Sequence, residues 1–460
     1  MKAPQNRQPV GDPFRICYED TGEWSEDCLA LTVCTPTLDE GARLPVMVFV
    51  HGGGFAFGSA RPPALDGTSL ARQGVVVVTI HHRLNVFGFL YLGEDERFAD
   101  AGNAGLLDIV AALRWARRNI DVFGGDPDNV TVFGQSGGGS KVALLLEMPE
   151  ARGLFHKAII QSASSLLRVA TLEEADRNTS HLLASLSLDE GDRDKILDLP
   201  APVLLEAMPR AVRNAGMVDD FRPVVDHRTL PRQPFDGSAP AASADVPVML
   251  GWAETEERAT FSRMPRLFDI SRAGVDRCVQ RLMGIAPEEA TEMVDVYRDC
   301  RPDDRPSDLL ALVYSDYRYR RNLTQVAELR ARMGSADTYC YLIRWRTPVW
   351  GGRLRTPHGL CLPFVFANAE VASALVGVGE EPSLLQDQMS GAWVAFARSG
   401  HPEHPMLPTW APFSTTERTT MVFDHPPRVV LDPAPEERRA MAKAPAYRPA
   451  SYEGGCNGFN

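Results

Sequence analysis

The sequence predicts an α/β fold: a mostly parallel β-sheet with helices packed on both of its faces. Two features of the chain favour this fold. Short apolar, β-branched runs recur along the sequence, and runs that are apolar on both faces are typical of strands inside a covered parallel sheet. Amphipathic helical patterns lie between these runs. Such alternation of strand and helix indicates a sheet wound with right-handed crossover connections.

The expected strands follow one another through the chain as residues 46–50, 75–80, 129–134, 157–162, 246–251 and 338–345. Within residues 104–119, apolar side chains fall at i, i+3, i+4 and i+7, the spacing of one helical face. A second helix is expected over residues 139–148. The stretches 171–213 and 261–332 also have helical patterns. We expect them to be insertions that cover the sheet within a single domain, residues 1–460.

The composition and charge of the chain disfavour several classes of protein. The 460-residue chain carries a formal net charge of −12, which disfavours nucleic-acid binding because that requires a basic patch. No apolar run approaches the roughly 18 residues of a membrane span, and the N-terminus lacks the apolar core of a signal peptide. Eight cysteines without a C-x-x-C pair indicate neither a zinc site nor a redox motif. We therefore expect a cytoplasmic protein that acts on neutral or weakly charged small molecules.

A glycine-rich turn surrounds Ser136 in the stretch VFGQSGGGSK, residues 132–141. It contains G-x-S-x-G between a strand pattern and a helical pattern. At a nucleophile elbow, glycines leave space for a serine held at strained backbone dihedrals. The helix that follows directs its free N–H groups and positive dipole end at the serine. An ordinary flexible loop is the alternative, and the strand–turn–helix context favours the elbow.

A second glycine-rich motif, HGGG at residues 51–54, directly follows the first expected strand. This is the position and pattern of an oxyanion loop, in which two backbone N–H groups converge on one oxygen because no Cβ obstructs them. Taken alone, it could be a simple glycine-rich turn. Both motifs lie at strand ends in the order that a nucleophilic serine and its oxyanion hole require, which favours a catalytic site.

Six longer stretches share a likeness. They are SEDCLALTVCTP (25–36), HGGGF (51–55), VVVTIHHRLNVFGFL (76–90), FGGDPDNVTVFGQSGGG (123–139), FHKAIIQS (155–162) and HGLCLPFVF (358–366). Together they resemble the type B carboxylesterases, the cholinesterase-like branch of the α/β-hydrolases, and among these the bacterial para-nitrobenzyl-esterase-like members. The resemblance extends from about Ser25 to Val430. It implies the α/β-hydrolase fold with helical cap insertions, and a serine carboxylesterase whose partners are small-molecule esters.

The resemblance also implies a set of site residues. The family's base lies in a segment like TPHGLCLPFVF, which identifies His358, and its acid follows a strand like VPVMLG, which identifies Glu256. With Ser136 they form a Ser–His–Glu triad in the chain order typical of this fold. The implied reaction passes through an acyl-enzyme on Ser136 and needs no cofactor or metal. The implied oxyanion donors are the backbone N–H groups of Gly53, Gly54 and Gly137.

Several alternatives remain. Glu254 becomes the acid if the loop register is shifted, and a further alternative is that Glu254, Glu256 and Glu257 are all solvated charges on a loop. The sequence HPEH at residues 401–404 could suggest a metal site, but its proline-flanked turn disfavours one. The pair His81–His82 replaces the family's usual Asn-Tyr, and we expect it to pack beneath the site. Finally, the family includes non-hydrolytic members with biosynthetic or binding roles, although the intact triad favours the enzyme.

The sequence departs from the family pattern in other places. An N-terminal segment that carries the family's first strands is not present, so we expect a truncated start. Gln135 and Gly137 replace the commoner Glu and Ala on either side of the serine. Cys361 replaces an acid three residues after the base, and we expect its thiol either to pack or to weaken support for the base. Cys28 lies on an expected strand without the family's disulfide partner, so we expect it to be free.

Overall fold

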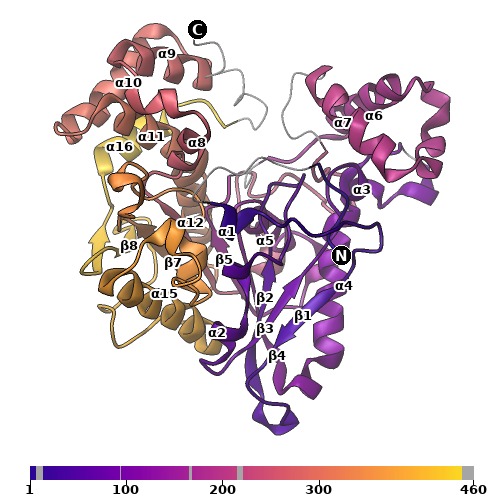
Figure 1. The fold of residues 1–460 in the computed structure, drawn as a ribbon, viewed down its shortest axis with the longest axis horizontal. Coiled ribbons are helices and arrows are strands. Elements are labelled where there is room, and N and C mark those ends of the chain that lie inside the picture. Colours follow the sequence, from indigo (N-terminus) through magenta and orange to yellow (C-terminus); the bar gives the residue numbers. More distant parts are fainter. Residues whose placement is uncertain (7–13, 94, 165–167, 215–220, 448–460) are drawn as a thin grey trace.

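The computed structural model describes residues 1–6, 14–93, 95–164, 168–214 and 221–447. Within these ranges, strands assemble into one sheet in the order β1-β3-β2-β4-β5-β6-β7-β8-β9 (Figure 1). From β3 through β8 all neighbours pair in parallel, and β1 and β9 pair antiparallel at the two edges. The expected mostly parallel sheet is confirmed. Its strands are β1 (Leu31–Cys34), β2 (Leu44–Val50), β3 (Val76–Ile80), β4 (Gly125–Gln135), β5 (Lys157–Gln161), β6 (Val248–Ala253), β7 (Thr338–Ile343), β8 (Thr419–Phe423) and β9 (Arg428–Leu431).

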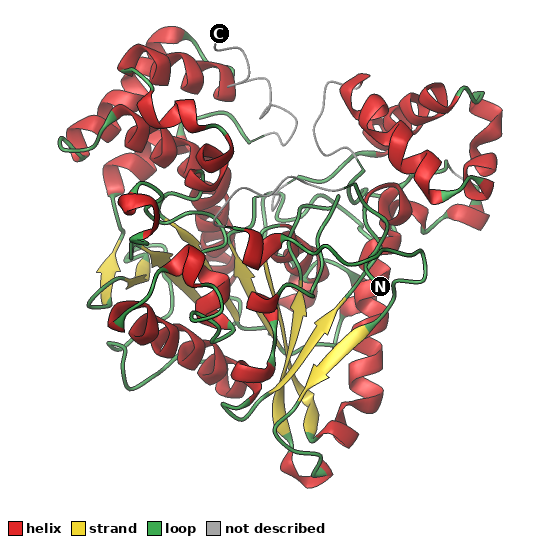
Figure 2. Ribbon diagram, viewed as in Figure 1, coloured by secondary structure: helices red, strands yellow, loops and turns green. Residues whose placement is uncertain are grey.

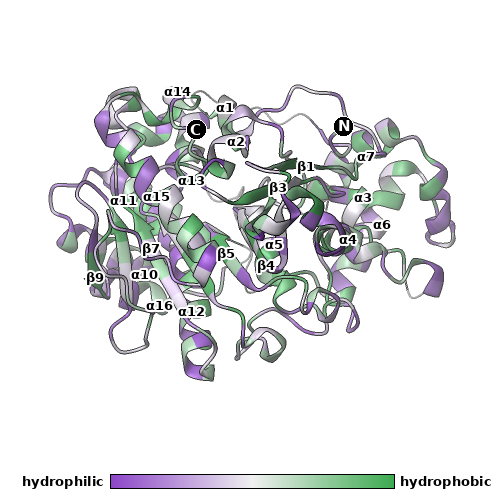
Figure 3. Cartoon of the chain, turned by 90° about the horizontal axis from the view of Figure 1, so that it is seen from below, coloured by the Kyte–Doolittle hydropathy of each residue, from purple (hydrophilic) through white to green (hydrophobic). Residues whose placement is uncertain are grey.

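Strand β2 shows why continuous apolar runs become central strands. Its side chains point alternately to the two faces of the sheet, as a pleated strand requires. Val46 and Val48 pack in one apolar core, whereas Met47 and Phe49 pack in another on the opposite face. Because helices cover both faces, both sets of side chains must be apolar. In Figure 3 the central strands are accordingly among the more hydrophobic parts of the chain.

Helices cover the two faces of the sheet (Figure 2). Helices α4 (Ala104–Asn119) and α12 (Arg321–Met333) contribute to the same core as Val46, and α13 (Cys361–Val365) and α15 (Glu380–Ser399) contribute to the other. The helix α4 has the bounds that its apolar periodicity predicts. Shorter and connecting helices are α1 (Arg15–Tyr18), α2 (Thr68–Ala71), α3 (Asn85–Phe89), α5 (Gly137–Leu145), α14 (Ser373–Val376) and α16 (Pro435–Ala442).

Two helical groups follow the carboxyl ends of β5 and β6. In Figure 1 they lie at the upper right and upper left. The first group contains α6 (Leu172–Leu186) and α7 (Ala201–Asn214), and the second contains α8 (Arg258–Arg263), α9 (Arg272–Met283), α10 (Pro287–Cys300) and α11 (Pro306–Ser315). The second group encloses an apolar core of its own. Helix α12 also falls in the stretch expected as an insertion, but it packs against the sheet because its apolar face continues the main core.

Two smaller expectations concern the described chain. Cys28 is buried and free, as expected, but it lies before β1 rather than on a strand. The backbone N–H of Cys28 donates to the carbonyl of Glu26 in a tight local turn. The pairing of β1 with β3 therefore begins only at Leu31. Among the helices of the described residues, none has the length and apolarity needed to cross a bilayer.

Candidate active site

Ser136 occupies a strained turn between β4 and α5. Its φ of 59° and ψ of −127° are unusual for a residue with a side chain. Its N–H donates to the carbonyl of Gln161 at 2.8 Å, which ties the turn to β5. A Cβ on Gly134 would lie 2.5 Å from the carbonyl carbon of Gly138, so the glycines are needed for close backbone contact. The turn therefore has the geometry of a nucleophile elbow.

His358 and Glu256 meet across two loops that follow neighbouring strands. His358 Nδ1 lies 2.7 Å from Glu256 Oε2, and the backbone N–H of His358 donates to the Glu256 carbonyl at 2.9 Å. The Glu256 carboxylate is fully buried and also accepts the N–H of Ala253 at 2.7 Å. The imidazole ring packs against Tyr319, with 5.0 Å between ring centres. Tyr319 belongs to a π-helical segment, η10 (Asp316–Arg320), that joins α11 to α12.

The same two loops are joined by a threonine pair. Thr255 precedes Glu256, and Thr356 lies two residues before His358. Each backbone N–H donates to the hydroxyl of the other threonine, at 2.8 and 2.9 Å, and the two hydroxyls lie 2.8 Å apart. Both residues are fully buried. This reciprocal arrangement fixes the acid loop to the base loop, and the family resemblance that identified the triad does not indicate it.

Gln135 occupies the hydrogen-bonding position at the other side of the imidazole. Its Nε2 lies 3.1 Å from His358 Nε2. With Nδ1–H directed at Glu256, Nε2 is the acceptor in this contact. In the part of the chain that the structure describes, the Ser136 hydroxyl makes no hydrogen bond, and the hydrogen-bond partners of the His358 ring are Gln135 and Glu256. Such contacts in an unliganded site often form only when substrate binds.

The oxyanion loop lies directly against the elbow. Gly53 and Gly54 have φ values of 95° and 62°, which side chains disfavour. A Cβ on Gly137 would lie 2.5 Å from the Gly54 nitrogen, so the two backbones are in contact. Within the described ranges, the N–H groups of Gly53, Gly54 and Gly137 have no hydrogen-bond partner. Three free donors beside Ser136 are what an oxyanion hole requires.

The structure separates Glu256 from its two neighbours. Glu254 accepts hydrogen bonds from Arg301 at 2.9 Å and Arg344 at 2.8 Å. Burial acts to raise the pKa of Glu254, but these guanidinium groups outweigh it and hold the pKa below its usual value. Glu257 accepts a hydrogen bond from Arg318 at 2.8 Å. Both acids are thus buried in ion pairs rather than solvated, because the cap helices cover this loop, and Glu256 is the one that contacts His358.

Cys361 lies below the site as a neutral, packed thiol. Gln161 Nε2 donates to its sulfur at 3.4 Å, and Trp393 Nε1 donates to the other end of the same amide at 3.4 Å. Burial, with the nearby Glu256 carboxylate, raises the pKa of the Cys361 thiol. Cys361 therefore packs rather than reacts, and Glu256 is held without it.

Lys141 is a further side chain at this site that the sequence reasoning missed. It lies on α5 and is completely buried, and its Nζ donates to the carbonyl of Gly54 at 2.6 Å. The sequence does contain a signal for this residue, because a lysine stands within an apolar helical run five residues after the serine.

Beside Lys141, His82 is buried and stacks on His51 with ring centres 4.4 Å apart, as the expected packing beneath the site requires.

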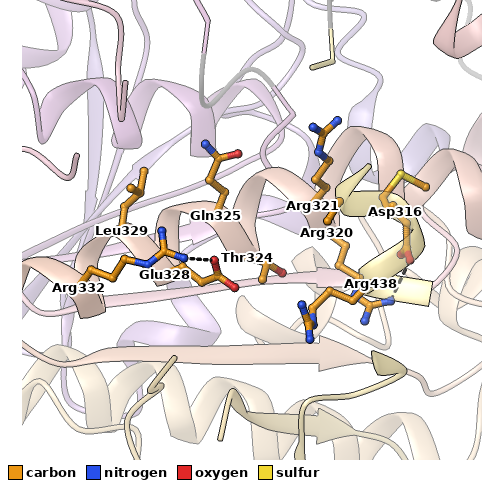
Figure 4. A pocket seen from close by; sticks show the side chains of 11 residues that line it. Asp316, Arg320, Arg321, Thr324, Gln325, Glu328, Leu329, Arg332 and Arg438 are labelled. Carbon is orange, nitrogen blue, oxygen red and sulfur yellow. Dashed lines mark hydrogen bonds and ion pairs between the residues drawn. The ribbon is translucent and has the colours of Figure 1, made fainter. Parts of the chain in front are cut away.

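A separate cavity of about 250 Å³ lies between α12, α16 and η10 (Figure 4). Three of its arginines are already in ion pairs: Arg332 with Glu328 at 2.8 Å, Arg320 with Asp316 at 2.8 Å, and Arg438 with Asp432 at 2.7 Å. The fourth, Arg321, donates to the backbone carbonyl of Pro445. None of the predicted site residues lines this cavity.

Among the described residues, no group of three or more histidine, cysteine or acidic side chains is placed to hold a metal ion.

Comparisons with known proteins show what this chain is similar to. The family model described as "Carboxylesterase family" matches residues 2–441. The para-nitrobenzyl esterase of Bacillus subtilis is 34% identical over 94% of this chain and 86% of its own length. A human cocaine esterase is 34% identical over 86% of this chain and 71% of its own length. The crystal structure of a Geobacillus stearothermophilus carboxylesterase superposes with a TM-score of 0.81 and 35% identity, over 95% of this chain and 88% of that one.

Proposed function

Since the chain belongs to the carboxylesterase family, with the α/β-hydrolase fold, and is a hydrolase acting on carboxylic esters, we propose that it works through an acyl-enzyme formed on Ser136. His358 is the general base and Glu256 is the acid that orients it. The substrates are small-molecule esters. The esterase relatives support this function over the alternative of a non-hydrolytic homologue.

The first half of the reaction acylates the serine. His358 Nε2 accepts the Ser136 proton as Oγ attacks the ester carbonyl carbon, which requires Nε2 to exchange its contact with Gln135 for one with the serine. Glu256 keeps the remaining ring proton on Nδ1 and stabilises the imidazolium that forms. The 2.7 Å contact between these two side chains supports this assignment. The tetrahedral intermediate then collapses, and the alcohol leaves with the proton from His358.

The negative oxygen of the tetrahedral intermediate needs donors that are already in place. The N–H groups of Gly53, Gly54 and Gly137 lie beside Ser136 and have no other partner among the described residues. Each such donor contributes roughly 3 kcal/mol to the transition state in comparable sites. In the second half, His358 activates water, which attacks the acyl carbon and releases the acid, and Ser136 recovers its proton.

The strained conformation of Ser136 is the observation that carries the proposal, because strain at a non-glycine residue is characteristic of functional positions. The test is reaction with a fluorophosphonate, followed by peptide mass spectrometry. We expect one modified residue, Ser136, and loss of both labelling and para-nitrophenyl butyrate hydrolysis in Ser136→Ala. Ser140→Ala is the matched control, since Ser140 is a buried serine one helical turn away. Labelling that persists in Ser136→Ala overturns the assignment.

A further inference from the structure

Lys141 is a buried cation whose place the reaction described above does not explain. Its side chain is completely buried, its Nζ donates to the Gly54 carbonyl at 2.6 Å, and it lies 5.3 Å from the centre of the Phe55 ring. Within the described residues it has no other hydrogen bond and no ion pair. Removing an ammonium group from water is costly unless a partner compensates it. A single carbonyl and an aromatic ring compensate this one only in part.

The neighbouring side chains supply no negative charge. His51, from the end of β2, and His82, from the segment after β3, are the titratable groups that the Lys141 charge reaches. Burial first, and then the charge on Lys141, lowers the pKa of both histidines well below 6.5. Both rings are therefore neutral at neutral pH. The cluster beneath the oxyanion loop is left with a net positive charge whenever Lys141 is protonated.

Gly54 is held from two sides by the same helix. Lys141 reaches its carbonyl, and Gly137, one helical turn earlier on α5, leaves the space that its backbone occupies. A Cβ on Gly137 would lie 2.5 Å from both the nitrogen and the Cα of Gly54. The hydrogen bond from Lys141 and the absence of a side chain at Gly137 thus act on one residue, Gly54, whose backbone N–H is an oxyanion donor.

We propose that Lys141 is a positioning residue for ester hydrolysis: its ammonium group holds the Gly54 carbonyl, keeps the oxyanion loop against Gly137, and places positive charge behind the oxygen that becomes negative in the transition state. The inference rests on the function proposed above. A charge in a poorly solvated site acts strongly on charge that develops nearby. Because that negative charge exists only in the transition state, Lys141 raises kcat and leaves substrate binding nearly unchanged.

This role has a pH dependence of defined sign. Burial lowers the pKa of Lys141 to about 7, so the ammonium charge is lost as pH rises past neutrality. His51 and His82 stay neutral over that range, and His81, whose pKa burial lowers to about 4, does also. Lys141 is therefore the member of this cluster that titrates there. We expect kcat to decline on the alkaline side of the profile.

The test is Lys141→Met, which keeps the length and apolar stem of the side chain and removes the charge. At pH 6.5 we expect kcat for para-nitrophenyl butyrate to fall by at least about tenfold, a fraction of the effect of deleting a direct oxyanion donor, with KM nearly unchanged. The alkaline decline should disappear. Affinity for a trifluoromethyl ketone, which forms an oxyanion adduct on the serine, should fall in parallel with kcat. In Lys141→Gln, which keeps an N–H donor without the charge, the alkaline decline should also be absent.

Lys157→Met is the matched control. Lys157 is another buried lysine, bonded to a single side-chain oxygen of Asn129, but it lies at the opposite end of β5 from the site. We expect Lys157→Met to leave kcat and the pH profile unchanged. The inference would be overturned if both Lys141 variants kept the wild-type kcat and pH profile. It would also be overturned if a lower Tm alone accounted for the loss of kcat. These results differ from failure of the proposed function, in which ester hydrolysis would survive Ser136→Ala.

Discussion

The hydroxyls of Thr255 and Thr356 lie 2.8 Å apart, and each accepts the backbone N–H of the other residue. These residues are 101 positions apart in the chain and belong to the loops that carry the acid and the base. The pair is therefore a direct connection between Glu256 and His358 that is independent of their own contact.

Replacing either threonine with valine keeps the shape and removes the hydroxyl. The partner's buried N–H then has no acceptor, which costs about 1–3 kcal/mol of folding free energy. We also expect kcat to fall more than KM rises, because the base loses part of its support. Urea unfolding and steady-state kinetics measure the two effects. Thr179→Val is the control: Thr179 is equally buried and hydrogen-bonded, but on α6. If both variants lose stability and neither loses kcat, the threonine pair is only structural.

Glu256→Gln should lower kcat by about 10⁴-fold, the loss seen when the orienting acid of a serine triad becomes an amide. The amide cannot stabilise the imidazolium, and it permits the wrong tautomer. We expect Glu257→Gln to have a far smaller effect on kcat, because Glu257 pairs with Arg318 instead. Kinetics on para-nitrophenyl butyrate compare the two variants. Equal losses would argue that the loop acts as a unit and that no single carboxylate orients His358.

Glu254 should contribute to stability rather than to chemistry. Its pKa is held below the usual value by Arg301 and Arg344. The stabilisation is therefore complete above the ordinary carboxyl pKa of about 4.3 and is lost as pH falls through the lower value of the folded state. Breaking such a buried pair costs about 3–5 kcal/mol. We expect Glu254→Gln to unfold at lower urea than wild type at pH 7, with a smaller difference at pH 3–4.

The exposed pair of Glu173 with Arg177 provides the control for that experiment, since solvent screens it. Glu173→Gln should change stability by less than about 1 kcal/mol at either pH. A Glu254→Gln deficit that stays constant down to pH 3 would show that the ion pairs are not its source.

Gln135→Glu should shift the pH dependence of hydrolysis. A carboxylate in place of the amide that now lies 3.1 Å from His358 Nε2 stabilises the protonated ring. Because the base must be neutral to accept the serine proton, the acid limb of the kcat/KM profile should move to higher pH. Gln135→Met, which has similar length and no charge, should leave that limb in place. A profile unchanged by glutamate would mean that this side chain turns away from the ring during catalysis.

Much of the fold could be predicted because strands such as β2 and β3 are apolar on both faces and need no distant information. The elbow could also be predicted, since the tightest contact of Gly134 is with Gly138, four residues away, although Gly138 itself is also needed for close contact with the distant Val50 of β2. The edge strand β9 and its neighbour β8 were not identified. Strand β9 is short and partly exposed, and β8 begins with two threonines, so neither has the continuous apolar pattern of the other interior strands.

The finer features of the site depend on contacts between distant segments. The Thr255–Thr356 pair, the Gln135 contact with His358 and the Lys141 contact with Gly54 each join segments that no local pattern relates. A sequence gives the residue types but not which rotamer faces which loop. Cys361 is the reverse case. Its residue type allowed two roles, packing or weakened support for the base, and its burial in the structure favours packing.

The close approach of Gly54 to Gly137 also restricts how this site can change over time. A methyl group at position 137 has no room while Gly54 lies against it, and Gly54 is held there by Lys141. An alanine at 137 therefore needs the loop to withdraw, and the hydrogen bond from Lys141 to Gly54 opposes that movement. The order of the two substitutions matters, and the wrong order passes through an inactive or misfolded intermediate. Substitutions at positions 137 and 141 are thus expected to be epistatic. The two residues should change together, and each combination should support the oxyanion in a different way.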